Sequence, residues 1–388
     1  MSDLGGAGRA AFRLHQGLLE IGEKSHVLCR ESQCHEPNVS VYAMSDFRRR
    51  FMTAWRYNTA LFDAWRIERQ NHRFAGFSFP FSPFSLEHHA LVHSADIIHL
   101  HWVAYFLNYP TFFRRVHKPI VWTLHDQNPL LGGFMYALDQ DRLQLPLDAR
   151  LKARKAAWIQ HATNLHVVAT NQWMKSHASE SLAFQGRPCH CIPNGVDLSV
   201  FRPYPRDAAR TRFGLPLDKR ILLYVVDTQA NAVYKGADIL VATLPALTRQ
   251  NLCVCGIGSF PNDTGCEIRS LLRQKNPHDL AELYSAVDFL IVPTREDTGP
   301  NTMLESMACG TPVIGTPIGG LRDFIRDGET GILCKDVSSD ALCHAVEIAL
   351  KHTFDRDHIR RFAEANFSLE QQARAYCEVY REALNHHD

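Results

Sequence analysis

Residues 289–320 read FLIVPTREDTGPNTMLESMACGTPVIGTPIGG, and this stretch decides the fold. The apolar run Phe289–Val292 has the length and composition of a buried strand. A polar loop follows it, and a helix then opens at Asn301 and ends at Gly310. The apolar stretch 312–315 comes next and has the character of a second strand. Because a strand, a crossover helix and another strand make a βαβ unit, the stretch predicts a parallel sheet.

Apolar runs alternate with segments of helical periodicity along the whole chain, which is typical of parallel sheets covered by helices. The strand candidates are residues 25–29, 96–101, 120–125, 165–169, 190–192, 221–226, 252–255, 289–292, 312–315 and 331–334. Segment 193–216, rich in Pro, Gly and polar residues, predicts an interdomain linker. We therefore expect an α/β protein of two Rossmann-like domains facing each other across a cleft. The first comprises 1–195 with a returning C-terminal helix, 368–388, and the second comprises 196–367.

The predicted C-terminal helix is amphipathic. Tyr376, Val379, Tyr380 and Leu384 fall near one face of it. We expect that face to pack on the first domain.

The composition excludes several classes of protein. Among 388 residues, 42 are Lys or Arg and 41 are Asp or Glu, and this balance argues against a dedicated nucleic-acid binder. A hydrophobic content of 45% excludes intrinsic disorder. No apolar run approaches the roughly 20 residues that span a bilayer, and the first residues lack the apolar core of a secretory signal. The 11 cysteines contain no CxxC pair, which indicates reduced thiols and a cytoplasmic protein.

The loop after the strand Phe289–Val292 and the first turn of the next helix predict an anion site. Gly299 and Pro300 leave the amides of that turn, at Asn301 and Thr302, uncovered by side chains. Those amides and the helix dipole together attract a negative charge.

Two carboxylates adjoin this predicted anion site. Glu305 lies four residues after Asn301, on the same helix face, where it would repel a phosphate that touched it. We therefore expect Glu305 to accept hydrogen bonds from neighbouring hydroxyl groups, such as those of a ribose. Asp297, in the loop, is placed to hold a second hydroxylated ring.

Here the sequence resembles the retaining glycosyltransferases of family 4, which have the GT-B fold. Their signature is an acidic pair with seven residues between its members, followed by a helix that ends in ACGTPV. Asp297 and Glu305 have that spacing, and residues 307–313 read MACGTPV. The family usually has Glu at the first position, whereas this chain has Asp297 with Glu296 beside it. The sequence leaves open whether Glu296 or Asp297 faces the sugar.

Other segments resemble the family at the expected places. Gly5, Gly6 and Arg9 look like its glycine-rich loop, and Asn194 lies in a segment similar to the entry into its linker. His125 ends a predicted strand, as does the family histidine that contacts the transferred sugar.

The resemblance extends to the second half. Lys235 matches the lysine that neutralises the donor diphosphate, and Gly256 matches a glycine turn beneath the nucleotide base. The family often has arginines immediately before this lysine and six residues before it, where this chain has Tyr234 and Gln229. The resemblance implies a catalytic set of His125, Lys235, Asp297 and Glu305, and donor-binding residues Gly5, Gly6, Arg9, Asn194, Gly256, Glu296, Gly299, Pro300, Asn301 and Thr302.

The implied function is transfer of a sugar from a nucleotide-diphosphate sugar to a hydroxyl group, with retention, in polysaccharide or glycoconjugate biosynthesis. The acceptor would be a glycan or a lipid-linked molecule. No metal or other cofactor is expected, and Cys189, His190 and Cys191 are too closely spaced for the usual zinc pattern. The basic and aromatic segment 47–73 has two interpretations: peripheral contact with the inner membrane face, or a helix whose aromatic residues pack on the domain while its arginines face water. The alternatives are a nucleotide-sugar epimerase of the same fold and a non-catalytic subunit that binds sugar nucleotides.

The glycine-rich loop begins only four residues after Met1. In the family a strand of about six apolar residues precedes this loop. We therefore expect the first sheet to lack its N-terminal strand, as in a truncated reading frame.

Overall fold

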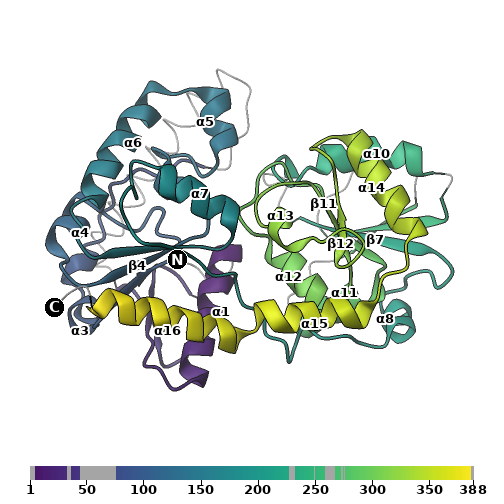
Figure 1. Ribbon diagram of the computed structural model, residues 1–388, viewed down its shortest axis with the longest axis horizontal. Coiled ribbons are helices and arrows are strands. Elements are labelled where there is room, and N and C mark those ends of the chain that lie inside the picture. Colours follow the sequence, from purple (N-terminus) through teal and green to yellow (C-terminus); the bar gives the residue numbers. More distant parts are fainter. Residues whose placement is uncertain are drawn as a thin grey trace. The chain divides into compact units, whose positions relative to one another are not determined.

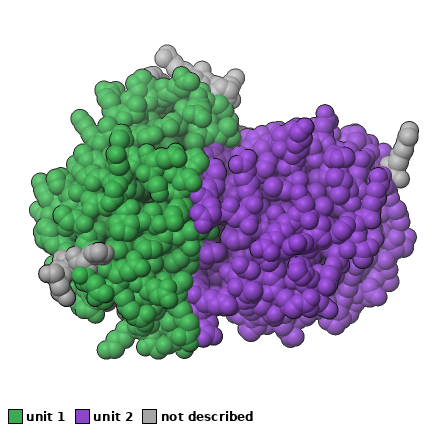
Figure 2. Space-filling model, viewed as in Figure 1, with its two compact units in different colours: residues 1–170, 174–192, 373–388 green, residues 171–173, 193–372 purple. Residues whose placement is uncertain are grey.

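The computed structural model of this chain describes residues 5–32, 36–43, 76–226, 232–248, 250–257, 267–271, 274 and 276–385. The chain forms two compact units (Figure 2). Unit 1 comprises residues 1–170, 174–192 and 373–388, and unit 2 comprises residues 171–173 and 193–372. Apart from residues 171–173, the chain leaves unit 1 after Ile192 and returns to it at Ala373.

Unit 2 contains a parallel six-stranded sheet in the order β12-β11-β10-β7-β8-β9 (Figure 1). Its strands are β7 (Arg220–Val225), β8 (Leu252–Ile257), β9 (Glu267–Leu271), β10 (Phe289–Val292), β11 (Val313–Gly315) and β12 (Gly331–Leu333). Its helices are α8 (Arg206–Arg212), α10 (Ala237–Leu247), α11 (Pro277–Ala286), α12 (Asn301–Ala308), α13 (Leu321–Phe324), α14 (Ser339–Lys351) and α15 (Arg356–Phe367).

Helices cover both faces of this sheet because alternate side chains of each strand point to opposite faces. On β7, Leu222 and Tyr224 pack with residues of α10 and α14. Ile221 and Leu223, on the other face, pack with residues of α8, α11, α12 and α15. The βαβ unit predicted from the opening stretch is present as β10, α12 and β11, with parallel pairing of Leu290 to Val313.

Unit 1 holds a parallel pair, β1-β2, and a separate parallel sheet in the order β3-β4-β5-β6. The strands are β1 (Val27–Cys29), β2 (Val39–Val41), β3 (Ile98–Leu100), β4 (Ile120–Leu124), β5 (Leu165–Ala169) and β6 (Cys189–Cys191). The helices are α1 (Gly6–Glu20), η1 (Leu86–His88), α3 (Ala90–Ser94), α4 (Tyr109–Arg115), η2 (Asn128–Leu130), α5 (Ala137–Leu143), α6 (Pro146–Ile159), α7 (Gln172–Glu180), whose first two residues belong to unit 2, and α16 (Leu369–Asn385).

The C-terminal helix α16 and α1 pack on one face of the four-stranded sheet, against Val121 and Val168. Tyr376 and Val379 are buried there, as predicted for an amphipathic helix. The prediction was wrong for Leu384, which is 40% exposed because it lies in the last turn of the helix.

A cavity of about 200 Å³ in unit 1 is lined by residues of α1, β1 and β3, among them Leu14, Leu18, Val27, Ile98 and Leu100. In the described part of the chain, β1 pairs only with β2 and β3 only with β4, and no strand precedes α1. Each of these two strands therefore has an edge whose backbone groups are left without a ladder partner. The cavity is flanked by both strands, where a further parallel strand would join the two sheets.

We expect this cavity to accept an added strand. Replacing residues 1–4 by about six apolar β-branched residues should join the two sheets and raise the free energy of unfolding by about 2 kcal/mol or more. The measurements are chemical denaturation and hydrogen exchange at the amides of β1 and β3, which should slow. An extension of the same length made of alternating Lys and Pro should change neither, and unchanged exchange with the apolar strand would contradict the prediction.

The predicted linker 193–216 is not a linker in the structure. It contains α8, and Val196, Phe201 and Leu215 are buried in the core of unit 2. The Pro and Gly residues of this segment indicated a loop. Its apolar residues are separated from one another and form no strand or helix pattern, yet they attach the segment to the domain.

Strands β2 and β9 were not predicted from the sequence. Both lie at the edge of a sheet, and their residues are mostly only half-buried, so neither has the continuous apolar run of a central strand. No disulfide joins any two of the described cysteines.

Segment 47–73, considered for membrane contact, lies outside the described residues. Within the described ranges, no helix combines the length and the apolar composition that crossing a bilayer requires.

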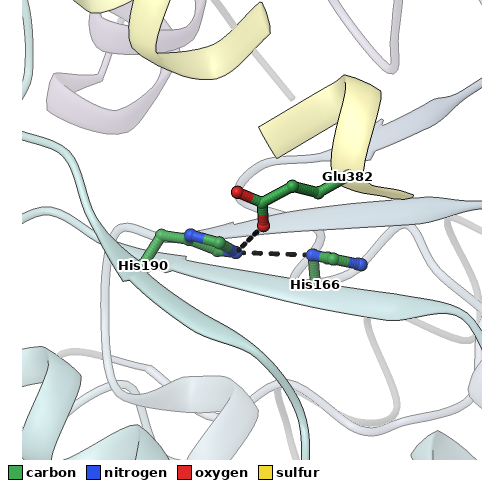
Figure 3. A group of neighbouring side chains, drawn as sticks. All are labelled: His166, His190 and Glu382. Atoms are coloured by element: carbon green, nitrogen blue, oxygen red, sulfur yellow. Dashed lines mark hydrogen bonds and ion pairs between the residues drawn. The ribbon is translucent and has the colours of Figure 1, made fainter. Parts of the chain in front are cut away.

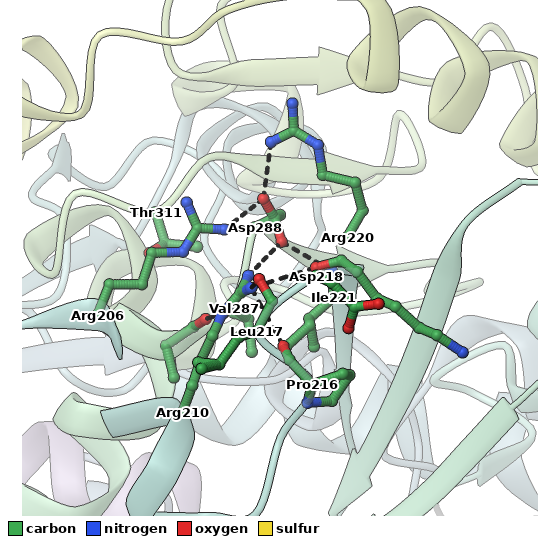
Figure 4. Close-up of polar contacts among 12 residues, drawn as sticks. Arg206, Arg210, Pro216, Leu217, Asp218, Arg220, Ile221, Val287, Asp288 and Thr311 are labelled. Carbon is green, nitrogen blue, oxygen red and sulfur yellow. Dashed lines mark hydrogen bonds and ion pairs between the residues drawn. The ribbon is translucent and has the colours of Figure 1, made fainter. Parts of the chain in front are cut away.

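A buried ion-pair network secures the amino end of the unit 2 sheet (Figure 4). Asp288 immediately precedes β10, and its side chain is 2% exposed. Its carboxylate accepts hydrogen bonds from Arg210 at 2.8 Å, from Arg220 at 2.9 Å and from the amide of Ile221 at 2.7 Å, and it also contacts Arg206. Burial alone would raise the pKa of Asp288, but the hydrogen bonds from Arg206 and Arg220 outweigh it and hold this pKa below its ordinary value.

Candidate functional site

The opposite, carboxyl end of β10 leads into the loop that carries the acidic residues. The carbonyl of Tyr234 secures this loop, because it accepts hydrogen bonds from the Arg295 amide at 2.7 Å and from Thr294 Oγ1 at 2.8 Å. Tyr234 occupies the place where the resembling family often has an arginine, and it is buried at 2% exposure. This residue therefore supports the loop through its main chain and adds no cation. The second such place, Gln229, lies outside the described residues.

Lys235 and Asp297 meet at this loop. The Lys235 ammonium forms an ion pair with Asp297 Oδ2, while the Gly299 amide donates to Asp297 Oδ1 at 3.1 Å. The Lys235 side chain is 29% exposed and that of Asp297 is 10% exposed. A cation and a carboxylate thus lie together, partly accessible, beside the start of α12. The structure brings Asp297 of the Glu296–Asp297 pair to Lys235, and both acidic residues are largely buried, Glu296 at 7% and Asp297 at 8% exposure.

Two glycines allow neighbouring backbone segments to approach closely at the loop that carries Asp297. Gly236, which precedes α10, has φ +67°, and a Cβ built on it would lie 1.8 Å from the Pro293 carbonyl oxygen. Gly319 has φ +53°, and its Cβ would lie 2.0 Å from the carbonyl oxygen of Asp297. Only glycine fits at both places, so the backbone segments at Gly236 and Gly319 hold the loop from two sides.

The first turn of α12 is placed beside this loop. Pro300 precedes the helix and makes no side-chain cap. Asn194 Nδ2 donates to Asn301 Oδ1 at 3.1 Å, and Asn301 and Thr302 are half-buried. The structure therefore brings together Asn194, Gly299, Pro300, Asn301 and Thr302, which the resemblance assigns to donor binding. Backbone amides of a first helical turn have no acceptor one turn earlier within the helix, which suits them to an anion.

Glu305 lies one turn further along α12 and is 3% exposed. Tyr284 of α11 donates its hydroxyl to Glu305 Oε2 at 3.1 Å. This tyrosine holds the carboxylate on the face of the helix that also carries Asn301. Sequence reasoning missed Tyr284, because nothing in the local pattern of α11 marks a residue whose partner lies on α12.

Gly256 does not form the predicted turn. It lies inside β8, which continues to Ile257, and it pairs with Tyr224 of β7 and Ser270 of β9. The prediction ended this strand at Cys255, and the resemblance to the family placed Gly256 in the turn after it.

In unit 1, His125 follows β4 directly, as predicted. A hydrogen bond of 2.9 Å joins His125 Nε2 and His101 Nδ1, and the two rings are stacked. His99 lies next to His101 and bonds Thr123 Oγ1 at 2.8 Å. Burial lowers the pKa of His125 to about 4 and that of His99 to about 3. These imidazoles are therefore neutral near pH 7 and act there as hydrogen-bonding groups.

Asp126 and Lys155 form a second polar group beside His125. Asp126 accepts hydrogen bonds from Trp102 Nε1 at 2.6 Å and from the Asn128 amide at 3.0 Å, and burial raises its pKa to about 6 in spite of them. Lys155 is buried and donates to the Asn128 carbonyl at 2.5 Å. Burial lowers the pKa of Lys155 to about 7, against the attraction of Asp126. Lys155 gave no sequence signal because α6 carries other lysines and arginines, and their pattern does not show which one is buried.

The residues predicted from the glycine-rich loop lie at the start of α1. Gly5 and Gly6 are exposed, and a Cβ on Gly5 would meet nothing within 4 Å. Because of this open space, the packing of unit 1 does not require a glycine at position 5. The Nε atom of Arg9 is buried and has no hydrogen-bond partner among the described residues.

The Gly236→Ala variant should show how far the loop depends on this close approach. We expect a loss of about 2–3 kcal/mol in the free energy of unfolding, because the left-handed backbone and the clash with Pro293 both oppose a side chain. Gly214 is a matched control, since it has φ +64° but open space around its Cβ. Gly214→Ala should cost only about 1 kcal/mol, which chemical denaturation can compare. Equal losses in the two variants would contradict the role given to the contact.

The six-stranded parallel sheet of unit 2 has helices on both faces, and unit 1 has its own parallel strands. Together with the loop at the carboxyl end of β10, they define an α/β protein of the GT-B class. The chain is similar to sucrose-phosphate synthase from Thermosynechococcus elongatus, with a TM-score of 0.66 and 20% identity over 97% of this chain and 93% of that one. It is also similar to HepE from Anabaena in complex with UDP-glucose, with a TM-score of 0.56 and 17% identity over 75% of this chain and 81% of that one.

Residues 4–200 match Glycosyltransferase Family 4, and residues 219–352 match Glycosyl transferases group 1. The chain therefore belongs to glycosyltransferase family 4. It is 34% identical over 214 residues to the D-inositol 3-phosphate glycosyltransferase of Thermobispora bispora. The corresponding protein of Mycobacterium tuberculosis H37Ra is 31% identical over 214 residues. These matches cover 49% and 50% of this chain, and the chain spans about half the length of these relatives, 49% and 44%.

Proposed function

We propose that this protein is a retaining glycosyltransferase that moves a sugar from a nucleotide-diphosphate sugar to a hydroxyl acceptor. The observation that carries the proposal is the Lys235–Asp297 ion pair beside the first turn of α12. It combines a cation for phosphate, a carboxylate for sugar hydroxyls and helix-terminal amides in one accessible place. Membership of glycosyltransferase family 4 and the UDP-glucose named for the similar HepE structure support a donor of this class.

Charge stabilisation of the leaving diphosphate is the main catalytic contribution in this proposal. The bond from the anomeric carbon to the diphosphate breaks in a transition state like an oxocarbenium ion, so negative charge grows on the phosphate oxygens. Lys235 and the amides of Asn301 and Thr302 would bind that charge. These groups supply the positive charge that a metal would otherwise provide, so the proposed reaction needs no resident cofactor.

The carboxylates would position the donor. Glu305, held by Tyr284, would accept hydrogen bonds from the ribose, and Asp297 would accept them from the sugar. His125 of unit 1 is assigned to the transferred sugar from the family resemblance, and its low pKa keeps it a neutral hydrogen-bonding group. We further propose that the leaving phosphate takes the proton of the incoming hydroxyl on the same face of the sugar, which yields retention.

The test is incubation of the full chain with UDP-, GDP- and ADP-sugars, with and without glycan, lipid-linked and inositol phosphate acceptors. Release of nucleoside diphosphate, together with a product of retained configuration, supports the proposal. Conversion of the donor sugar without transfer would identify the epimerase instead. Binding of a donor without any turnover would identify a non-catalytic subunit, and the absence of binding to every donor would overturn the proposal.

A further inference from the structure

A cluster of side chains that can bind a metal lies in unit 1 (Figure 3). His166 of β5, His190 of β6 and Glu382 of α16 direct their polar ends at one another. The distance from His166 Nδ1 to His190 Nε2 is 3.3 Å, and that from His190 Nε2 to Glu382 Oε2 is 3.6 Å. All three ligand atoms lie within 4.8 Å of one another.

The sheet and the C-terminal helix create this arrangement. Residue 190 pairs with Val168 in the parallel ladder of β5 and β6, so His166 and His190 project from the same face as diagonal neighbours. Helix α16 packs on that face through Tyr376 and Val379, and its last turns carry Glu382. Asn164 Nδ2 also donates to the carbonyl of Ala383 at 2.7 Å, which fixes this end of the helix beside the two histidines.

We propose that His166, His190 and Glu382 form a binding site for Zn²⁺ or a similar divalent transition metal. Zinc binds nitrogen at about 2.0–2.1 Å, so two nitrogens of a tetrahedral site lie about 3.3 Å apart. The observed separation of the two ring nitrogens is 3.3 Å, and that of His190 from the carboxylate oxygen is slightly longer. Two imidazoles and one carboxylate are zinc ligands, whereas Mg²⁺ and Ca²⁺ prefer oxygen ligands alone.

The ring nitrogens can accept the metal with little chemical change. A neutral imidazole carries one proton, and moving it to the other ring nitrogen frees the lone pair that faces the partner. The exposed Glu382 and the partly buried His190 give the ion a path from solvent, and they leave the fourth position to water.

Such an ion would attach the end of α16 to the edge of the sheet. Its ligands come from three segments that are far apart in the sequence. Metal binding would therefore stabilise the docking of the C-terminal helix on unit 1. This arrangement explains why sequence spacing gave no metal signal: Cys189 and Cys191 adjoin His190, but alternation along β6 places both cysteines on the other face.

The test is titration of the EDTA-treated and dialysed full chain with ZnCl₂ at pH 7.5, followed by calorimetry. We expect one tightly bound ion per chain and a higher midpoint of thermal unfolding with zinc. Affinity should fall at least about tenfold in His190→Ala and in Glu382→Gln. The matched controls are His161→Ala, an exposed histidine of unit 1, and Glu378→Gln, an exposed glutamate of α16. Both should bind zinc as the parent does.

Cobalt distinguishes this site from cysteine sites. Co²⁺ bound here should give the visible absorption of a tetrahedral nitrogen and oxygen site, without a band from thiolate charge transfer. Failure of the parent chain to bind zinc at about 100 μM would overturn the proposal. So would binding that persists in both His190→Ala and Glu382→Gln, or a thiolate band with cobalt.

Discussion

Replacement of Lys235 by alanine is expected to lower kcat/KM for the proposed transfer by about 10²–10³-fold. Lys235 is the cation that the structure places at Asp297 beside the start of α12. Tyr234, where related sequences often have an arginine, is buried and contributes no charge. Losing this ammonium therefore removes a large share of the positive charge available to the leaving diphosphate.

Steady-state kinetics with the active donor measure this effect. Lys351→Ala is a matched control, because Lys351 is an exposed lysine in the last turn of α14. Lys235→Arg should retain more activity than Lys235→Ala, since charge is kept while the geometry changes. Because the Lys235 side chain is partly exposed, the variant should fold normally, and circular dichroism can verify it. Activity of Lys235→Ala equal to that of the control would show that the cation plays no part in the reaction.

The largest expected effect on stability comes from Asp288→Asn. This change leaves the guanidinium of Arg210, which is 4% exposed, without its buried counter-charge. We expect a loss of about 3–5 kcal/mol in the free energy of unfolding, measured by chemical denaturation near pH 7. Arg206 and Arg220 also lose their charged partner, but they are more exposed and can turn to water, so we expect the buried Arg210 to account for most of this cost.

The pH dependence of this effect has a definite sign. The folded state holds the pKa of Asp288 below its ordinary value, so the ion pair stabilises the parent above about pH 4 and this stabilisation declines as the pH falls further. The difference between parent and Asp288→Asn should therefore shrink on acidification. Asp279→Asn, which breaks the more exposed pair with Arg212, should cost about 1 kcal/mol or less. Similar losses in the two variants would contradict the importance of burial at Asp288.

The local part of the candidate site could be predicted from the sequence. The structure confirms the predicted order of a strand, a loop that contains Asp297 and a helix that begins at Asn301. These elements consist of contiguous residues. Turn and helix signals act over a few residues, so a single sequence contains them in full. The contact of Lys235 with Asp297 could not be predicted in this way. It depends on the strand order of the sheet, in which β7 lies beside β10.

The long-range supports could not be predicted in this way. The hydroxyl of Tyr284 reaches Glu305 only because α11 and α12 pack on the same face of the sheet. Asp288 with its arginines looks, in the sequence, like ordinary surface charge. Gly256 was placed in a turn because the sequence does not show that β8 lies between two partners, and the backbone ladder there accommodates a glycine.

The most direct test of the central claim is hydrogen exchange of the full chain with saturating UDP, GDP or ADP. A nucleoside diphosphate held by Lys235 and the start of α12 should slow exchange in residues 235–239 and 297–303, and Lys235→Ala should weaken that protection. Protection confined to other segments, or no effect from any of the three nucleotides, would contradict the assignment of the site.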